Sequence, residues 1–159
     1  KKDRAPYDVW AAQGFLRTTP GATVDYETVA LDIAELLADL DVSAIAFDRW
    51  RIDLLQKELE RIGIDLPLIP HGQGFKDMSP ALDTLEAELL NGRIAHGGHP
   101  VLTMCAANAV ATKDPSGNRK LDKSRRTGRI DGIQAMAMAF GAAYSSEAPA
   151  EIDTEVFFL

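Results

Sequence analysis

Two short apolar runs, separated by an amphipathic segment, limit the folds open to this chain more than any other feature. The runs are Ser43–Phe47 and Leu66–Ile69, and apolar runs of this length are typical of strands covered on both faces in a parallel sheet. Between them, apolar residues recur at helical spacing, at Ile52, Leu55, Leu59 and Ile62. Gly63 then stands where a helix C-cap glycine belongs. The segment therefore predicts a β-α-β unit in an α/β protein.

The rest of the pattern predicts one extended segment, four helices and a hairpin. Aromatic and apolar residues between Tyr7 and Thr19 favour a short extended segment that closes in a turn. A polar hairpin, with its turn at Pro115–Asn118, precedes the last helix. Helices are predicted over 25–41 with Asp25 as N-cap, 79–91 with Ser79 and Pro80 at its start, 100–110, and 131–142.

Length and composition indicate one globular domain. The chain has 159 residues, of which 46% are hydrophobic and 26% are charged, as in ordinary soluble domains. Its longest uncharged apolar stretch, Ile133–Ala143, is shorter than the ~18–20 residues needed to cross a bilayer, and Lys1–Arg4 leads into no signal-peptide core. We therefore expect no membrane association and no secretion. The single cysteine, Cys105, fits core packing in a reducing cytoplasm.

Charge is distributed unevenly along the chain. The formal net charge is −7, but residues 113–129 hold seven cations against Asp114 and Asp122, so this segment carries +5 and the other 142 residues carry −12. The cations are Lys113, Arg119, Lys120, Lys123, Arg125, Arg126 and Arg129. A solvated loop is the ordinary explanation of such a run, and a contact with phosphates is the alternative.

Two aspartates are candidates for metal chemistry. Asp48 ends the first apolar strand, and ligands of open α/β sheets bind outside the carboxyl ends of strands. Asp131 is the only charge on the apolar last helix and directly follows the arginines. Two-metal hydrolysis of a phosphodiester needs carboxylates that hold the ions, together with cations that place the backbone. The structural alternatives are a helix cap for Asp48, and a helix-dipole charge or a salt bridge to Arg125, Arg126 or Arg129 for Asp131.

Two other candidate centres have weaker support. The chain has three histidines, His71, His96 and His99, and the last two form a His-Gly-Gly-His sequence. A zinc site would favour ligands aligned on a helix or nearby cysteines, and the sequence predicts neither here. The Gly72–Gly74 loop lacks the Lys-Ser/Thr of a phosphate-binding loop, so an ATPase or GTPase site is not favoured.

An ordered series of short motifs runs through residues 6–143. Each motif is weak alone, whereas their order and spacing together are specific. They are Pro6–Trp10, Gln13–Leu16, Thr18–Gly21, Ile45–Trp50, Gln73–Phe75, Met78–Pro80, Gly92–His96, Asn108, Asp122–Ser124 and Arg129–Gly132. The series resembles the nuclease domain of the large terminase subunit of tailed double-stranded DNA bacteriophages.

The resemblance implies a fold, an activity and a set of partners. The fold is α/β and RNase H-like (retroviral integrase-like), with a mixed sheet flanked by helices. The activity is a Mg²⁺- or Mn²⁺-dependent endonuclease that hydrolyses concatemeric double-stranded DNA during genome packaging. Asp48 and Asp131 would be two ligands of the two-metal site, close enough to share an ion, and the Lys113–Arg129 segment would approach DNA. Implied partners are double-stranded DNA, the terminase ATPase domain, the small terminase subunit and the portal, in the cytoplasm of the bacterial host.

The resemblance also implies that part of the nuclease domain lies outside this chain. We expect residues 1–143 to form the domain and 144–159 an acidic tail. The family's domain opens with a central strand that carries the first catalytic aspartate, followed by a second strand, before the segment that Pro6–Trp10 matches. Asp3 and Asp8 are the only early carboxylates, and neither follows an apolar strand. We therefore expect the first strands and the first metal ligand to be missing.

Two functional hypotheses remain at this stage. The first is the endonuclease, with the missing carboxylate supplied from outside the chain. The second is a catalytically silent module that binds DNA or docks onto the packaging machinery through the basic hairpin and the apolar Val156–Leu159 segment. A nucleotide-binding doubly wound domain shares the β-α-β pattern, but no glycine fingerprint follows either strand.

Overall fold

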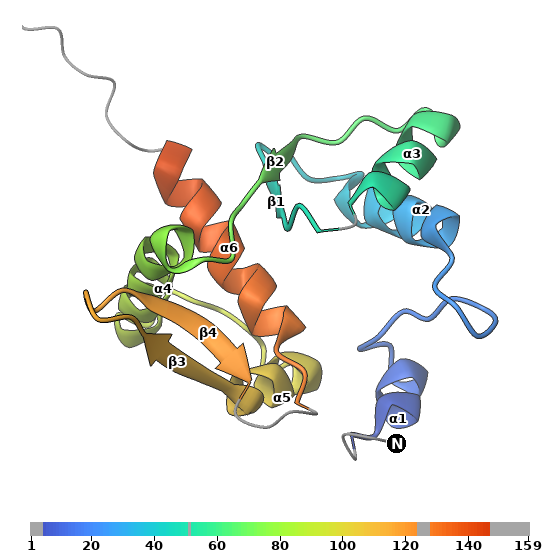
Figure 1. Cartoon of the computed structure of the whole chain (residues 1–159). Coiled ribbons are helices and arrows are strands. Elements are labelled where there is room, and N and C mark those ends of the chain that lie inside the picture. Colours follow the sequence, from blue (N-terminus) through green and yellow to red (C-terminus); the bar gives the residue numbers. More distant parts are fainter. Residues whose placement is uncertain (1–4, 51, 124–127, 147–159) are drawn as a thin grey trace, which may run out of the picture.

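The computed structural model describes residues 5–50, 52–123 and 128–146, which form helices and short strands (Figure 1). In chain order the elements are α1 Tyr7–Ala12, α2 Tyr26–Leu37, β1 Ile45–Phe47, α3 Asp53–Ile62, β2 Leu68–Pro70, α4 Phe75–Leu90, α5 Pro100–Asn108, β3 Ala109–Lys113, β4 Arg119–Lys123 and α6 Asp131–Ser146. The predicted α/β class is confirmed.

The predicted β-α-β unit is present. β1 and β2 pair in parallel, with Ile45 opposite Leu68 and Phe47 opposite Pro70, and α3 connects them. Gly63 ends α3 in the left-handed conformation at φ 72°, which glycine adopts without steric penalty. The residues of β1 are half-buried, where full burial was expected, because a sheet of two strands has no inner strand.

The strands run in both directions but form two separate sheets among the described residues. β1 and β2 make the parallel pair, whereas β3 and β4 make an antiparallel hairpin with Ala109 opposite Lys123. Asp114 closes the hairpin turn, since its carboxylate accepts hydrogen bonds from the backbone N–H groups of Ser116 and Asn118. The predicted hairpin is therefore confirmed, and the parallel and antiparallel pairing expected of a mixed sheet are both present, in two small sheets among the described residues.

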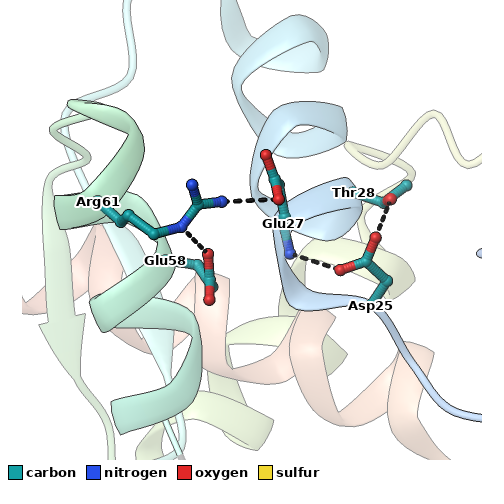
Figure 2. A network of polar contacts seen from close by, with 5 residues as sticks. All are labelled: Asp25, Glu27, Thr28, Glu58 and Arg61. Carbon is teal, nitrogen blue, oxygen red and sulfur yellow. Dashed lines mark hydrogen bonds and ion pairs between the residues drawn. The ribbon is translucent and has the colours of Figure 1, made fainter.

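Helices α2 and α3 form a pair on the other side of the β1–β2 sheet from α4 and α6 (Figure 1). Asp25 caps α2 as predicted, accepting hydrogen bonds from the Glu27 N–H at 3.2 Å and from the Thr28 hydroxyl at 2.7 Å. Arg61 of α3 then reaches both Glu27 and Glu58, each at 2.7 Å (Figure 2). Such exposed ion pairs contribute little to stability.

The main core lies between α4 and α6. Its buried side chains come from both helices: Met78, Leu82 and Leu85 from α4, with Ala137 and Met138 from α6. The two helices approach closely at Gly141, where a Cβ atom would lie only 2.5 Å from Nε2 of His71 and 2.9 Å from Cβ of Ala81. The core therefore brings α6 against both α4 and the segment that follows β2.

The prediction of an extended segment over 7–19 was wrong, because this region begins with helix α1. Tyr7–Ala12 is helical, with Asp8 in the first turn and the Trp10 N–H donating to the Pro6 carbonyl. The Tyr7 and Trp10 rings, one helical turn apart, meet edge to face with centroids 5.8 Å apart. Aromatic residues favour strands only when they pack on a sheet, and here their contact is within one helix.

Other helix bounds also differ from expectation: α2 ends at Leu37 instead of residue 41, and α5 ends at Asn108, so that Val110 lies in β3. α4 begins at Phe75 instead of Ser79, so Pro80 lies inside the helix. Pro80 has no N–H to donate to the Lys76 carbonyl, but the missing bond falls in the second turn, on an exposed face. α6 extends to Ser146, whereas the pattern predicted its end at residue 142.

Candidate functional site

Asp48 lies at the carboxyl end of β1, as predicted. Its Oδ1 atom accepts a hydrogen bond from the Trp50 N–H at 3.2 Å, and its Oδ2 atom accepts one from Nε2 of Gln73 at 2.9 Å. Gln73 follows β2, and the ends of parallel neighbours meet at one edge of a sheet. Asp48 is not a helix cap, because α3 begins only at Asp53. Its exposed carboxylate is therefore oriented from two sides.

A cavity of about 530 Å³ opens at this edge of the sheet. Asp48 and Asp77 bring carboxylates to its wall, and Arg49 and Lys76 bring cations. The Asp77 carboxylate lies so close to the Gly72 backbone that it leaves no room there for a Cβ atom. The cavity thus carries charged side chains of both signs on a partly apolar wall.

His71 adds a neutral or cationic ring to the same cavity. Its Nδ1 atom lies 2.8 Å from the Gly72 carbonyl, which can only accept, so this nitrogen donates and carries a proton. Nε2 points towards Gly141 of α6. His96 lines a different pocket, and among the described residues no three His, Cys, Asp or Glu side chains gather to hold a metal ion.

Asp131 lines a different cavity, of about 380 Å³, together with Tyr7, Cys105 and Arg129. It stands in the first turn of α6, where the helix dipole favours a carboxylate. Gly141, which lines the cavity of Asp48, lies ten residues further along α6, which corresponds to about 15 Å of helix. The described residues therefore do not bring Asp48 and Asp131 into one cavity, and an ion shared by them stays a prediction.

The basic hairpin presents its cations unequally. Lys113 and Lys123 are exposed, whereas the Arg119 side chain is only 22% exposed and forms ion pairs with Asp83 and Glu86 of α4. The Lys120 ammonium lies 4.9 Å from the centre of the Phe75 ring, a cation–π contact. Arg129 is exposed just before α6. Arg125 and Arg126 lie outside the described residues.

Comparison with known proteins gives the family. A family model described as "Terminase large subunit, endonuclease domain" matches residues 1–147. The chain belongs to this family. It is 65% identical over 143 residues to the terminase large subunit of Enterobacteria phage HK97, which covers 90% of this chain and 28% of that protein. It is 30% identical over 139 residues to protein YmfN of Escherichia coli K12, which covers 86% of this chain and 30% of that one.

Solved structures of terminases match this chain as well. The crystal structure of the HK97 large terminase has a TM-score of 0.82 and 65% identity, over 88% of this chain and 29% of that one. The nuclease of the large terminase from thermophilic phage G20c has a TM-score of 0.58 at 20% identity, over 77% of this chain and 63% of that one, and supports the fold alone. The chain spans less than a third of the length of the HK97 and Escherichia coli relatives.

These comparisons confirm the resemblance read from the motifs, whereas the site residues stay predictions. Sequence reasoning did not assign a role to Gln73, although its place after β2, at the edge where Asp48 lies, was a usable signal. In the part of the chain that the structure describes, every helix is too short or too polar to cross a bilayer.

A buried carboxylate near the cavity was also missed. Glu88 of α4 is only 9% exposed, and it accepts hydrogen bonds from Nε and Nη2 of Arg93 at 2.7 and 2.5 Å and from the Tyr144 hydroxyl at 3.1 Å. The Arg93 guanidinium, opposed by burial and assisted by Tyr144, holds the pKa of Glu88 below its ordinary value. Because Tyr144 also lines the cavity of Asp48, Glu88 connects α4 to the α6 wall of that cavity.

This cluster predicts acid sensitivity. A carboxylate whose pKa is lowered by folding stabilises the native state above its unfolded pKa, here about 4.5, and the stabilisation is lost as pH falls through the folded pKa. We expect Glu88→Gln to be less stable than the native chain at pH 7, with the difference shrinking below pH 4.5. Urea unfolding at several pH values measures it. Glu60→Gln, at an exposed position on α3, is the control, and a difference that stays constant with pH would contradict the prediction.

Proposed function

We propose that this chain is the catalytic part of a metal-dependent endonuclease that cuts concatemeric double-stranded DNA during phage genome packaging. The observation that carries the proposal is the match of residues 1–147 to the terminase endonuclease family. An RNase H-like architecture is part of the proposal and is supported by the similarity to the terminase nuclease folds.

The proposed metal ligands are Asp48 and Asp131, with Mg²⁺ or Mn²⁺ as the ions. Their carboxylates are the hard oxygen donors that such cations take, one at a strand end and one in the first turn of a helix. The ions, when bound, would activate water and stabilise the leaving 3′-oxygen. Gln73 and the Trp50 N–H would orient the Asp48 carboxylate. Among the described residues no three His, Cys, Asp or Glu side chains gather at one place, and the proposal includes a further carboxylate from outside this chain.

The proposed partners follow from the family. They are double-stranded DNA, the terminase ATPase domain, the small terminase subunit and the portal, in the cytoplasm of the bacterial host. The relatives are more than three times as long as the matched segment, so further domains of such a subunit have room to make these contacts.

Cleavage of supercoiled plasmid tests the activity. A polypeptide that carries this chain together with the segment proposed to supply the further carboxylate is incubated with Mg²⁺, with Mn²⁺ or with EDTA, and both nicked and linear products are measured. Cleavage with either metal and none with EDTA is the expected result. Binding without cleavage in that polypeptide would favour the silent DNA-binding module.

The hairpin predicts a salt-dependent interaction with DNA in spite of the acidic net charge of −7. Each phosphate contact contributes about −0.9 to the slope of log affinity against log salt. We expect Lys113→Gln and Lys123→Gln each to reduce the slope by about 0.9, because both lysines are exposed. Fluorescence anisotropy with Ca²⁺ in place of Mg²⁺ measures binding without cutting.

The control for this experiment is Lys57→Gln, which removes the same charge from an exposed position on α3. Its slope should equal that of the native chain. If the slope of log affinity against log salt changes equally in all three variants, the salt dependence of binding reflects the net charge of the chain and not phosphate contacts of the hairpin.

A further inference from the structure

Arg119 ties the basic hairpin to α4. Its Nη1 atom lies 2.8 Å from Oε2 of Glu86, and its Nη2 atom donates to Oδ1 of Asp83. Its backbone N–H donates to the Ser79 hydroxyl at 3.1 Å. Arg119 is the first residue of β4, so these contacts hold the strand where it leaves the hairpin turn.

The contact extends along one face of α4. Lys120 reaches Phe75, and Arg119 reaches Ser79, Asp83 and Glu86, which follow at steps of four, four and three residues. Residues spaced in this way lie on one side of a helix. Leu121, on the same strand as Arg119 and Lys120, packs against the core cluster between α4 and α6. The hairpin is therefore docked on α4 through polar and apolar contacts at once.

The docking matters because the two exposed lysines are far apart on the hairpin. Lys113 pairs with Arg119 next to the turn, whereas Lys123 pairs with Ala109 at the other end. Arg119 and Lys123 are four residue steps apart along β4, about 13 Å. If the hairpin is already held in place, both lysines can contact the phosphates of one DNA molecule without a loss of conformational entropy in the hairpin on binding.

We propose that Arg119 is a positioning residue: its ion pairs with Asp83 and Glu86 hold the hairpin so that Lys113 and Lys123 contact DNA phosphates, and Arg119 itself contacts none. This rests on the proposed function for its DNA ligand. A phosphate that bound Arg119 would have to displace two carboxylates from the same guanidinium.

The sign of one charge change separates positioning from direct contact. The double variant Asp83→Asn with Glu86→Gln removes two negative charges and releases Arg119. If Arg119 contacts phosphate, or if only net charge matters, DNA affinity rises. If Arg119 positions the hairpin, affinity falls, by about 3- to 10-fold, because the loosened hairpin must be ordered on binding. Glu60→Gln with Asp65→Asn is the control, since it removes two exposed charges away from the hairpin.

Arg119→Gln and a charge swap complete the experiment. Arg119→Gln should lower the affinity but leave the salt slope unchanged, whereas loss of a phosphate contact would reduce the slope by about 0.9. The swap of Arg119→Glu with Asp83→Arg keeps the net charge and can re-form the ion pair. It should recover more affinity, relative to Arg119→Glu alone, than Arg119→Glu with Asp65→Arg does, because the two double variants carry the same net charge and only the first can re-form the ion pair with residue 119.

Hydrogen exchange of the free chain tests, without DNA, whether the ion pairs of Arg119 hold the hairpin on α4. Amides of residues 109–123 should exchange faster in the double variant and in Arg119→Gln than in the native chain, while amides of α2 and α3 stay unchanged. Unchanged hairpin exchange, higher affinity of the double variant, or a lower slope in Arg119→Gln would each overturn the proposal. Failure of the DNA-binding function itself would be seen separately, as slopes that Lys113→Gln and Lys123→Gln do not alter.

Discussion

Asp48→Asn and Asp131→Asn are each expected to abolish metal-dependent DNA cleavage while leaving the fold intact. Asn keeps nearly the volume of Asp but removes the negative charge that holds a divalent cation. Substitution of groups that only support a metal ligand typically costs 10- to 100-fold, so loss of a ligand should cost at least about 100-fold. Plasmid nicking with Mg²⁺ and Mn²⁺ measures the rate, in a polypeptide that carries this chain together with the segment proposed to supply the further carboxylate.

The matched control is Asp65→Asn, at an exposed position before β2. It makes the same chemical change away from both cavities and should cut at the native rate. Circular dichroism establishes that each variant is folded. A native rate in Asp48→Asn or Asp131→Asn would remove that residue from the metal site. Since the two carboxylates line different cavities, the experiment also decides whether both of them serve one reaction.

The fold was largely predictable where local chemistry and periodicity agree. Asp25 caps α2, Gly63 ends α3, and the apolar runs that flank α3 form the parallel pair β1–β2. In each case a residue type with one strong conformational preference stands at the end of a regular apolar pattern. α1 was missed because its aromatic residues suit both a strand and a helix, and the contact of Tyr7 with Trp10 is a matter of packing.

The candidate site was only partly predictable. Placement of Asp48 at a strand end follows from the pattern, because a strand delivers the next residue to the edge of the sheet. Partners that come from distant segments do not follow from it. Gln73 reaches Asp48 across 25 residues, and Arg119 reaches Asp83 across 36. Sequence alone assigned Arg119 to DNA by its charge, whereas the structure gives it two carboxylate partners on α4.

The α4–α6 interface links the two parts of the site. α4 carries Lys76 and Asp77 at the cavity of Asp48, and Asp83 and Glu86 at the hairpin. α6 carries Asp131 at one end and Gly141 at the wall of that cavity. The packing of the two helices therefore sets the positions of the cavity and of the hairpin together, and its loss should affect both.

Met78→Ala is expected to destabilise the chain by about 2–5 kcal/mol, a large part of the ~5–15 kcal/mol typical of a domain. Met78 is fully buried in the α4–α6 core, and its Sδ atom accepts a hydrogen bond from Nε2 of Gln134 at 3.3 Å. The substitution removes three heavy atoms and leaves a cavity that the two helices close only in part. Urea unfolding, followed by far-UV circular dichroism, measures the change as a lower midpoint at an unchanged slope.

Leu90→Ala is the matched control, since Leu90 lies on the same helix but is 82% exposed. Exposed substitutions usually change stability by no more than about 0.5 kcal/mol, so the two variants should differ several-fold in effect. Equal effects would show that the α4–α6 contact is not the core of the domain. Faster hydrogen exchange of the hairpin amides in Met78→Ala would show that the core also positions α4 for the ion pairs of Asp83 and Glu86 with Arg119.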